Sequence, residues 1–173
     1  MSELTVHGLG TSVRVDLGEH IDPDEFATAW SRCLLDDAQT SASASTAQGA
    51  TPVVPGGRSM TSLTQSITRA LIEQRAGELL MLHAGAVCNP TTGASIAYVA
   101  PGGTGKTTLS RLLGSTYGYL TDETVGIEPR TWEIEPYPKP LSTRTPEGGY
   151  PKCELGPDEL GLLAAHPRPR LST

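Results

Sequence analysis

One stretch of nine residues constrains the fold of this chain more than any other: Ala100-Pro101-Gly102-Gly103-Thr104-Gly105-Lys106-Thr107-Thr108. The apolar run Ile96–Val99 directly before it predicts a strand, and a helix is expected to begin near Lys106. A strand, a glycine-rich loop and a helix in this order are typical of a loop that binds phosphate. Glycines let backbone N–H groups converge on one point, and the helix N-terminus adds roughly half a positive charge there.

The loop matches the pattern G-x-x-x-x-G-K-[ST] with one departure, since Ala100 stands where the pattern has its first glycine. Lys106 is expected to reach the β- and γ-phosphates of a nucleotide, and the Thr107 hydroxyl to ligate Mg²⁺. Thr108 lies one residue further into the helix and counts with the predicted nucleotide site, although no particular phosphate or metal contact is assigned to it. The alternative is a glycine-rich turn that binds nothing. The residues predicted to bind the nucleotide are Gly102, Gly103, Thr104, Gly105, Lys106, Thr107 and Thr108.

Length, charge and cysteine content narrow the class of protein. A chain of 173 residues can form one domain with a core, with or without a small appendage. A formal net charge of −6 without a basic cluster argues against nucleic acid as a partner. No run of about 18 apolar residues is present that could span a membrane, and the N-terminus lacks the pattern of a signal peptide. Three widely spaced cysteines (Cys33, Cys88 and Cys153) indicate free thiols in a cytoplasmic protein.

Composition divides the chain into three parts. Residues 1–36 predict an N-terminal appendage, with a half-buried strand over residues 4–17 and a helix that begins at Asp22-Pro23. Residues 37–61 are rich in Ser, Thr, Ala, Gly and Pro and predict a flexible linker. Residues 62–173 form the domain that holds the glycine loop. Its tail, residues 136–173, is proline-rich, is expected to be mostly extended with at most a short helix around Asp158–Ala165, and is compatible with an incomplete domain.

Within that domain the patterns predict an α/β fold with a mixed sheet. A helix is expected from Ser62 to about Leu82, and a short one from Lys106 to about Ser115 with Leu109, Leu112 and Leu113 facing inward. The expected strands are Leu82–Cys88 and Ala94–Val99, which form a β-hairpin before the loop, then two strands around an acidic turn in 118–127, and one around 132–137.

Three further residues are candidates for chemistry near the loop. Asp122 and Glu123 end a strand 16 and 17 residues after Lys106, where phosphoryl-transfer enzymes place carboxylates that hold Mg²⁺ or accept a proton. An exposed acidic turn is the alternative reading of this pair. His83 begins the strand expected beside the loop strand, so proximity to the phosphates is plausible, although a lone histidine is usually structural.

These motifs in this order resemble the catalytic domain of HPr kinase/phosphorylase, whose nucleotide-binding core is related to phosphoenolpyruvate carboxykinase. The resemblance covers roughly residues 80–130. It implies that His83 is an active-site histidine and that Asp122 is the catalytic aspartate that activates a serine hydroxyl. Glu123 stands where the family usually has a second aspartate near the metal. The family's downstream glycine-rich signature is not visible after Glu128, so the chain is expected to be a diverged or C-terminally shortened member.

The resemblance implies an ATP-dependent serine kinase with the cofactors ATP and Mg²⁺ and an acceptor hydroxyl on a peptide or small protein. Catalytic roles are expected for Asp122 and His83, and metal contacts for Thr107 and Glu123. Two other functions remain open: a small-metabolite kinase with the same type of loop, and a nucleotide-binding scaffold without catalysis. A homo-oligomer is compatible with the sequence.

Overall fold

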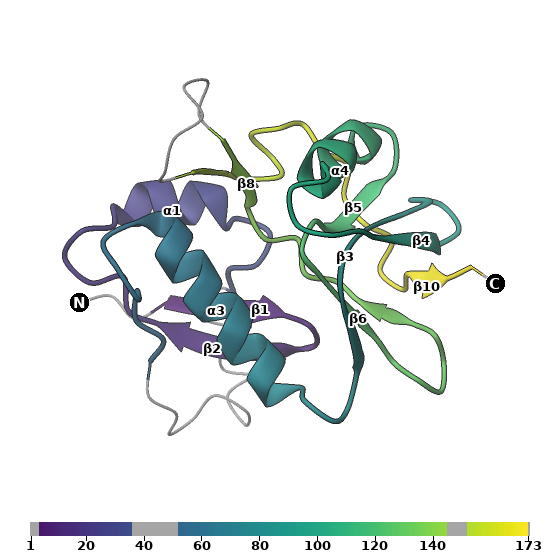
Figure 1. Ribbon diagram of the computed structural model, residues 1–173, viewed down its shortest axis with the longest axis horizontal. Helices are drawn as coiled ribbons and strands as arrows, with labels where there is room; N and C mark the ends of the chain where they lie inside the picture. The colour runs from purple at the N-terminus through teal and green to yellow at the C-terminus, as the bar shows by residue number, and fades with distance from the viewer. Residues whose placement is uncertain (1–3, 36–51, 145–151, 173) are drawn as a thin grey trace.

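The N-terminal part of the chain folds as a β-hairpin with helices packed on it (Figure 1). The computed structural model describes residues 4–35, 52–144 and 152–172. Strands β1 (Leu4–Gly8) and β2 (Thr11–Val15) pair antiparallel, and Leu9 and Gly10 between them have φ values of 53° and 71°. Two turn residues with positive φ match the twist of a tight hairpin. The prediction of one strand over residues 4–17 was therefore wrong.

Two helices accompany the hairpin. Helix α1 (Pro23–Ala29) begins as predicted, with Asp22 Oδ1 accepting hydrogen bonds from the backbone N–H groups of Asp24 and Glu25. Helix α3 (Met60–Gln74) begins two residues earlier than predicted, with Ser59 as its N-cap.

The end of α3 differs from the prediction. The helix was expected to continue to about Leu82, but it ends at Gln74. Gly77 follows with a φ of 84°. Glycine adopts this left-handed conformation without strain, and a residue in this conformation typically ends a helix. Residues from Leu80 onward then pair with another strand, so hydrogen bonds of a sheet replace those of a longer helix.

The largest hydrophobic core lies between the hairpin and α3. Trp30 is fully buried and stacks on Phe26, with ring centroids 5.6 Å apart, and it contacts Tyr137 from the tail. The Tyr137 hydroxyl lies 2.8 Å from Thr68 Oγ1 on α3. Helix α3, which the sequence placed with the second part of the chain, thus packs on the first part, together with a residue of the tail.

Most of the predicted linker, residues 37–61, falls outside the described ranges. At its described end, Val53 lies beside β2: its N–H donates to Arg14 O over 2.8 Å, and its carbonyl accepts from Asp16 N over 2.9 Å. Met60 then begins α3. The described part of this stretch is therefore joined to the hairpin.

A second sheet forms the other half of the molecule, in the order β10-β4-β3-β6-β7 with β5 also pairing with β3. Strand β3 (Leu80–Cys88) pairs antiparallel with β4 (Ala94–Val99), which confirms the predicted hairpin. The two halves of β3 pair with β6 (Thr124–Ile127) and β5 (Gly118–Thr121), respectively. Because β10 (Arg170–Leu171) joins β4 in parallel, the sheet is mixed.

The tail contains strands and turns in place of the expected short helix. Strand β7 (Ile134–Glu135) pairs with β6, and it is shorter than the strand predicted around residues 132–137. Strands β8 (Leu141–Thr143) and β9 (Cys153–Leu155) form an antiparallel ribbon. Turns follow it, and the described residues between 158 and 165 contain no helix. Within the described ranges, no helix has both the length and the apolar character needed to cross a membrane.

Helix α4 (Lys106–Gly114) has the predicted position but not the predicted orientation. Leu109 and Leu112 are 39% and 69% exposed, whereas the buried residues of the helix are Lys106, Ser110 and Gly114. Ser110 Oγ lies 2.6 Å from the Tyr98 hydroxyl on β4, and Leu162 packs on Gly114. Small side chains let α4 approach these neighbours closely, so Leu109 and Leu112 face outward and their predicted inward orientation was wrong, whereas Leu113 is half-buried.

The environments of the three cysteines predict different thiol reactivities. Burial raises the pKa of Cys33 to about 12 and also raises that of Cys88, whereas Cys153 is exposed. Because the thiolate is the reactive form, we expect a single thiol to react quickly with DTNB at about pH 8. The other two should react only after unfolding in urea. Cys153→Ser should abolish the fast phase, and a fast phase that survives this substitution would contradict the packing described here.

Candidate functional site

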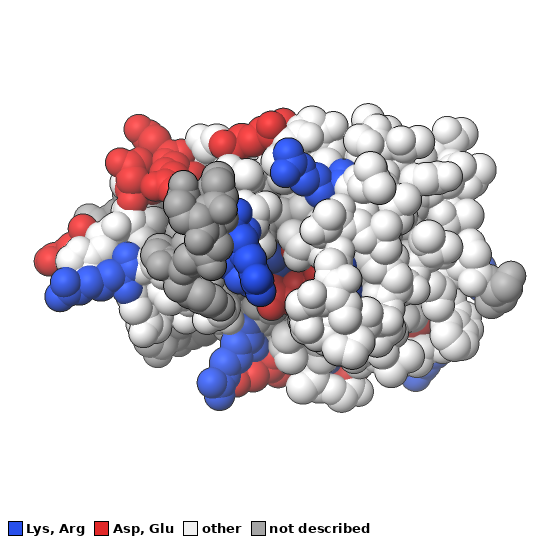
Figure 2. All heavy atoms as spheres, turned by 45° about the horizontal axis from the view of Figure 1, so that its top comes forward, with Lys and Arg blue, Asp and Glu red and all other residues white. Residues whose placement is uncertain are grey.

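A cleft of about 540 Å³ lies between α3, the glycine loop and the β8–β9 ribbon (Figure 2). This volume falls within the range of small-molecule sites, about 300–1,000 Å³. Five basic side chains line it against two carboxylates, although the whole chain carries a net charge of −6. The lining residues comprise loop glycines, hydroxyl and amide side chains, one histidine and these charged groups: Thr61, Thr64, Gln65, His83, Gly102, Gly103, Gly105, Lys106, Thr107, Thr108, Arg111, Asp122, Glu123, Lys139, Ser142, Thr143, Arg144 and Lys152.

The glycine loop combines open space around its glycines with backbone N–H groups that have no partner among the described residues. Gly103 and Gly105 have φ values of 80° and 96°, which favour glycine. A Cβ placed on Gly102, Gly103 or Gly105 would meet no atom within 4 Å. The backbone N–H groups from Gly103 to Lys106 donate no hydrogen bond to a described residue. Open space beside unpaired amides at the start of α4 is what an oxyanion requires.

Lys106 and Thr104 currently contact the loop itself. Lys106 Nζ donates to the carbonyl oxygens of Ala100 and Pro101, at 2.6 and 3.2 Å. Thr104 Oγ1 donates to Pro101 O over 2.7 Å, and among the predicted nucleotide-binding residues Thr104 is the one that does not line the cleft. Lys106 Nζ has three N–H donors, so two are taken up inside the loop and one is left for an acceptor in the cleft.

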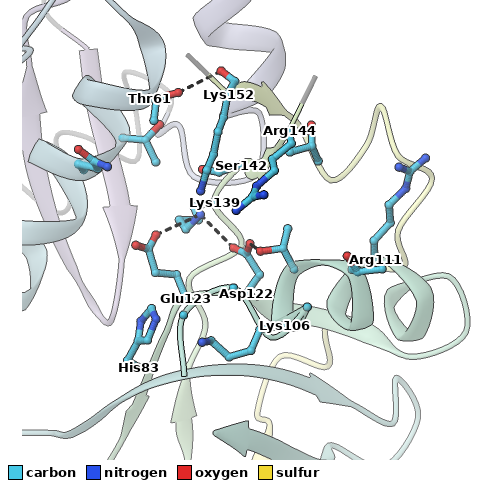
Figure 3. Close-up of a pocket in the computed structure, with 18 residues that line it drawn as sticks. Thr61, His83, Lys106, Arg111, Asp122, Glu123, Lys139, Ser142, Arg144 and Lys152 are labelled. Carbon is cyan, nitrogen blue, oxygen red and sulfur yellow. Dashed lines mark hydrogen bonds and ion pairs between the residues drawn. The ribbon is translucent and has the colours of Figure 1, made fainter. Parts of the chain in front are cut away.

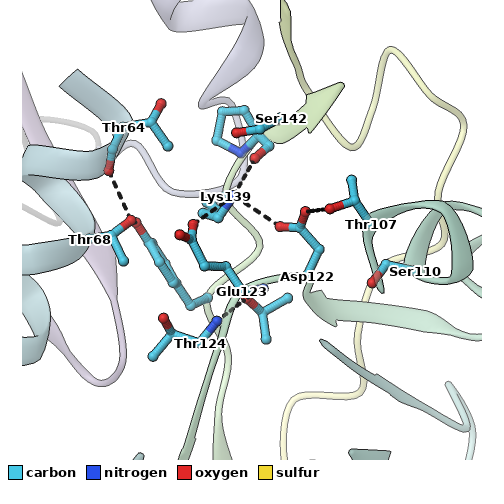
Figure 4. A network of polar contacts seen from close by, with 12 residues as sticks. Thr64, Thr68, Thr107, Ser110, Asp122, Glu123, Thr124, Lys139 and Ser142 are labelled. Carbon is cyan, nitrogen blue, oxygen red and sulfur yellow. Dashed lines mark hydrogen bonds and ion pairs between the residues drawn. The ribbon is translucent and has the colours of Figure 1, made fainter. Parts of the chain in front are cut away.

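Thr107 joins the glycine loop to the acidic turn (Figure 4). Its Oγ1 donates to Asp122 Oδ2 over 2.8 Å. Asp122 follows β5 and is only 4% exposed, and its other oxygen, Oδ1, accepts from the buried hydroxyl of Tyr119 over 3.3 Å. Burial, followed by the charge of Asp122, raises the pKa of Tyr119 well above its ordinary value, so this hydroxyl stays protonated and donates. Asp122 is thus held in one orientation.

Lys139 is a central residue of the site that the sequence analysis missed. Its Nζ lies 2.9 Å from Asp122 Oδ1 and 3.2 Å from Glu123 Oε2, and its side chain is 1% exposed (Figure 3). Burial lowers the pKa of Lys139, but Asp122, Glu123 and Glu154 outweigh this effect and raise it above the ordinary value. The sequence holds no signal for this role, because a lysine within Pro136-Tyr137-Pro138-Lys139-Pro140 is ordinarily expected to be exposed to solvent.

Glu123 and His83 lie on the more open side of the cleft. The Glu123 side chain is 34% exposed, compared with 3% for Asp122. His83, an exposed residue of β3, lines the same cleft, and its neighbour Ala84 donates its N–H to Glu123 O over 3.0 Å. The fold therefore brings His83, Asp122 and Glu123 together with the loop.

The oxygen atoms of the site suit a hard cation that is held together with phosphates. Thr107 Oγ1 and the carboxylates of Asp122 and Glu123 are ligands that Mg²⁺ accepts, and Mg²⁺ usually takes one or two carboxylates together with substrate phosphates. No group of three or more His, Cys, Asp or Glu side chains in the described ranges could hold a metal ion by itself. These residues therefore fit Mg²⁺ that arrives with a nucleotide better than a free metal ion.

Comparison with known proteins leaves the family open. No protein-family model, curated protein or solved structure matches this chain. What the structure does give is a mixed α/β fold with a mixed sheet.

Removing the buried cation should destabilise the fold. In Lys139→Met the two carboxylates lose their counter-charge, so we expect the free energy of unfolding to fall by about 3–5 kcal/mol near neutral pH. Because the pKa of Lys139 is raised, its contribution is complete below the ordinary value of 10.5 and is lost only in stronger alkali. Urea unfolding of both proteins at about pH 7 measures the difference.

The double variant Lys139→Met/Asp122→Asn serves as the control. It removes one of the two uncompensated charges and should recover part of the lost stability. Equal unfolding midpoints for the original chain and Lys139→Met would show that the ion pair contributes nothing.

Proposed function

We propose that this chain transfers the γ-phosphoryl group of Mg²⁺–ATP to a hydroxyl group on a peptide or small protein. The observation that carries this proposal is the 2.8 Å hydrogen bond between Thr107 of the glycine loop and Asp122 of the acidic turn. This hydrogen bond joins the glycine loop, which is suited to bind phosphate, to a carboxylate that is suited to accept a proton. Both line one cleft together with Lys106 and His83.

The loop and α4 would bind the triphosphate. The unpaired N–H groups from Gly103 to Lys106 would donate to phosphate oxygens, with the N-terminus of α4 directed at the same place. Lys106 would exchange its two carbonyl partners for phosphate oxygens, and a bond to a charged acceptor is the stronger one. Bound Mg²⁺ would neutralise phosphate charge, with Thr107 and Glu123 as its protein contacts.

Asp122 would position the acceptor hydroxyl and take its proton. Its Oδ2 accepts one hydrogen bond, from Thr107, and therefore has a second lone pair available. Thr107, Tyr119 and Lys139 fix the carboxylate, so an acceptor hydroxyl would meet a base that is already oriented. His83, on the open side of the cleft, would contact the acceptor or the transferred phosphate.

A nucleotide-binding protein without transferase activity is the second candidate, and a specific observation favours it. Lys139 Nζ contacts Asp122 and Glu123 at once, so both carboxylates already hold a buried cation from the tail. Under this reading the cleft binds nucleotide, and the carboxylates serve to hold the tail through Lys139.

The variant Asp122→Asn separates these two functions. We expect it to bind Mg²⁺–ATP within about twofold of the original chain in calorimetry. It should lose about 100-fold or more of γ-phosphate transfer from labelled ATP to a pool of serine-containing peptides, because it lacks the base. Transfer that persists in Asp122→Asn would eliminate this aspartate as the base.

Two further measurements complete the test. Lys106→Ala should lose nucleotide binding and transfer together, which identifies the loop as the nucleotide site. If the original chain binds Mg²⁺–ATP and labels none of the peptides, the nucleotide-binding function gains support over the kinase. Without ATP binding by the original chain, both functions fail.

A further inference from the structure

The wall of the cleft opposite the glycine loop carries basic charge that the proposed phosphoryl transfer does not use. Arg144 directly follows β8 and Lys152 directly precedes β9, and their neighbours Thr143 and Cys153 are register partners. The two basic residues therefore extend from the same end of the ribbon. Figure 3 shows both side chains reaching into the cleft toward Lys139.

These two cations have no carboxylate partner among the described residues. Lys139 is neutralised by Asp122 and Glu123, whereas none of the ion pairs in the described ranges includes Arg144 or Lys152. Like charges that converge without a counter-ion repel one another, and an anion between them removes that repulsion. A negatively charged group placed between the two side chains would be attracted by both of them.

The first turns of α3 form the adjoining surface. Thr61, Thr64 and Gln65 line the cleft, and Thr61 Oγ1 donates to Lys152 O over 3.0 Å, which fixes the helix beside the ribbon. Helix α3 has 15 residues and no acidic side chain in its first turn, so the positive end of its dipole is not neutralised there.

Thr64 supplies the independent sign of a ligand. It is only 1% exposed, it lines the cleft, and its Oγ1 has no hydrogen-bond partner among the residues that the structure describes. A buried hydroxyl without a partner costs about 1–3 kcal/mol, so such groups usually have a role. An oxyanion held by Lys152 and Arg144 would give this hydroxyl an acceptor.

We propose that Thr64, Arg144 and Lys152 form a second anion-binding subsite, distinct from the glycine loop, that takes a phosphate or carboxylate group of the acceptor. This inference rests on the proposed function, because it assigns the acceptor a negative charge near the hydroxyl that receives the phosphoryl group. The subsite and the glycine loop lie on opposite walls of one cleft. The nucleotide and an acidic acceptor can then bind side by side.

The test titrates inorganic phosphate, and in parallel acetate, into the full chain saturated with Mg²⁺ and a non-hydrolysable ATP analogue. With the loop occupied, we expect one further phosphate to bind saturably and to shift the amide resonance of Thr64 in NMR spectra. Lys152→Gln should weaken this binding about tenfold or more, since it removes a charged hydrogen-bond donor. Stronger binding of acetate than of phosphate would identify the group as a carboxylate.

Matched variants separate the subsite from general charge and from folding. Arg130→Gln removes an exposed positive charge that does not line the cleft, and it should leave phosphate binding unchanged. Thr64→Val should weaken phosphate binding but raise Tm, because it removes an unpaired buried hydroxyl. Thr64→Ser should bind phosphate like the original chain.

Failure of the subsite and failure of the proposed function give different results. Lys106→Ala, titrated without nucleotide, should still bind phosphate at Thr64. If the original chain binds no nucleotide but this variant shifts the Thr64 resonance, the kinase proposal fails and the subsite stands. No saturable phosphate binding in the nucleotide-loaded chain, or equal weakening by Arg130→Gln and Lys152→Gln, would overturn the subsite.

Discussion

The contact of one buried lysine with two carboxylates holds the cleft together. Lys139 brings the tail of the chain onto Asp122 and Glu123, and Asp122 in turn holds Thr107 at the start of α4. The lysine also donates to Pro140 O over 2.9 Å. Because little water reaches these three charged groups, each depends on the opposite charge of its neighbours. The charge of Lys139 therefore joins the loop, the acidic turn and the tail at one point.

The sequence predicted the parts of the fold that depend on local patterns. The hairpin of β3 and β4, the position of α4 and the cap of α1 all follow from neighbouring residues, and the structure confirms them. The orientation of α4 did not follow, because Ser110 and Gly114 pack against residues distant in the sequence, Tyr98 and Leu162. Lys139 could not be assigned either, since its carboxylate partners lie 16 and 17 residues before it, on another strand end.

The cleft joins the two halves of the molecule. Its one wall comes from α3, which belongs to the N-terminal core, and the other comes from the loop between β4 and α4. Tyr137 is buried in the N-terminal core, and Lys139, two residues later, is buried in the cleft. Prolines at positions 136, 138 and 140 restrict the backbone around these two residues. A shift of Tyr137 in the core is therefore transmitted to Lys139 in the cleft. The sequence patterns predicted that the N-terminal part is an appendage, because they do not reveal that the apolar side of α3 packs on the N-terminal hairpin.

Strand β10 has a consequence for how copies of the chain behave toward one another. It is short, yet Arg170 N donates to Gly93 O over 2.8 Å and Ser172 N donates to Ser95 O over 2.9 Å, so it satisfies backbone groups along β4. It pairs with Ala94 and Ser95 alone, so beyond them this edge of β4 has no partner strand among the described residues, next to the exposed side chains of Ile96 and Val99. An open, apolar edge of this kind recruits strands from other molecules and leads to aggregation. Strand β10 therefore covers only the start of this edge, and within the described ranges the rest of β4 is available to a strand of another copy.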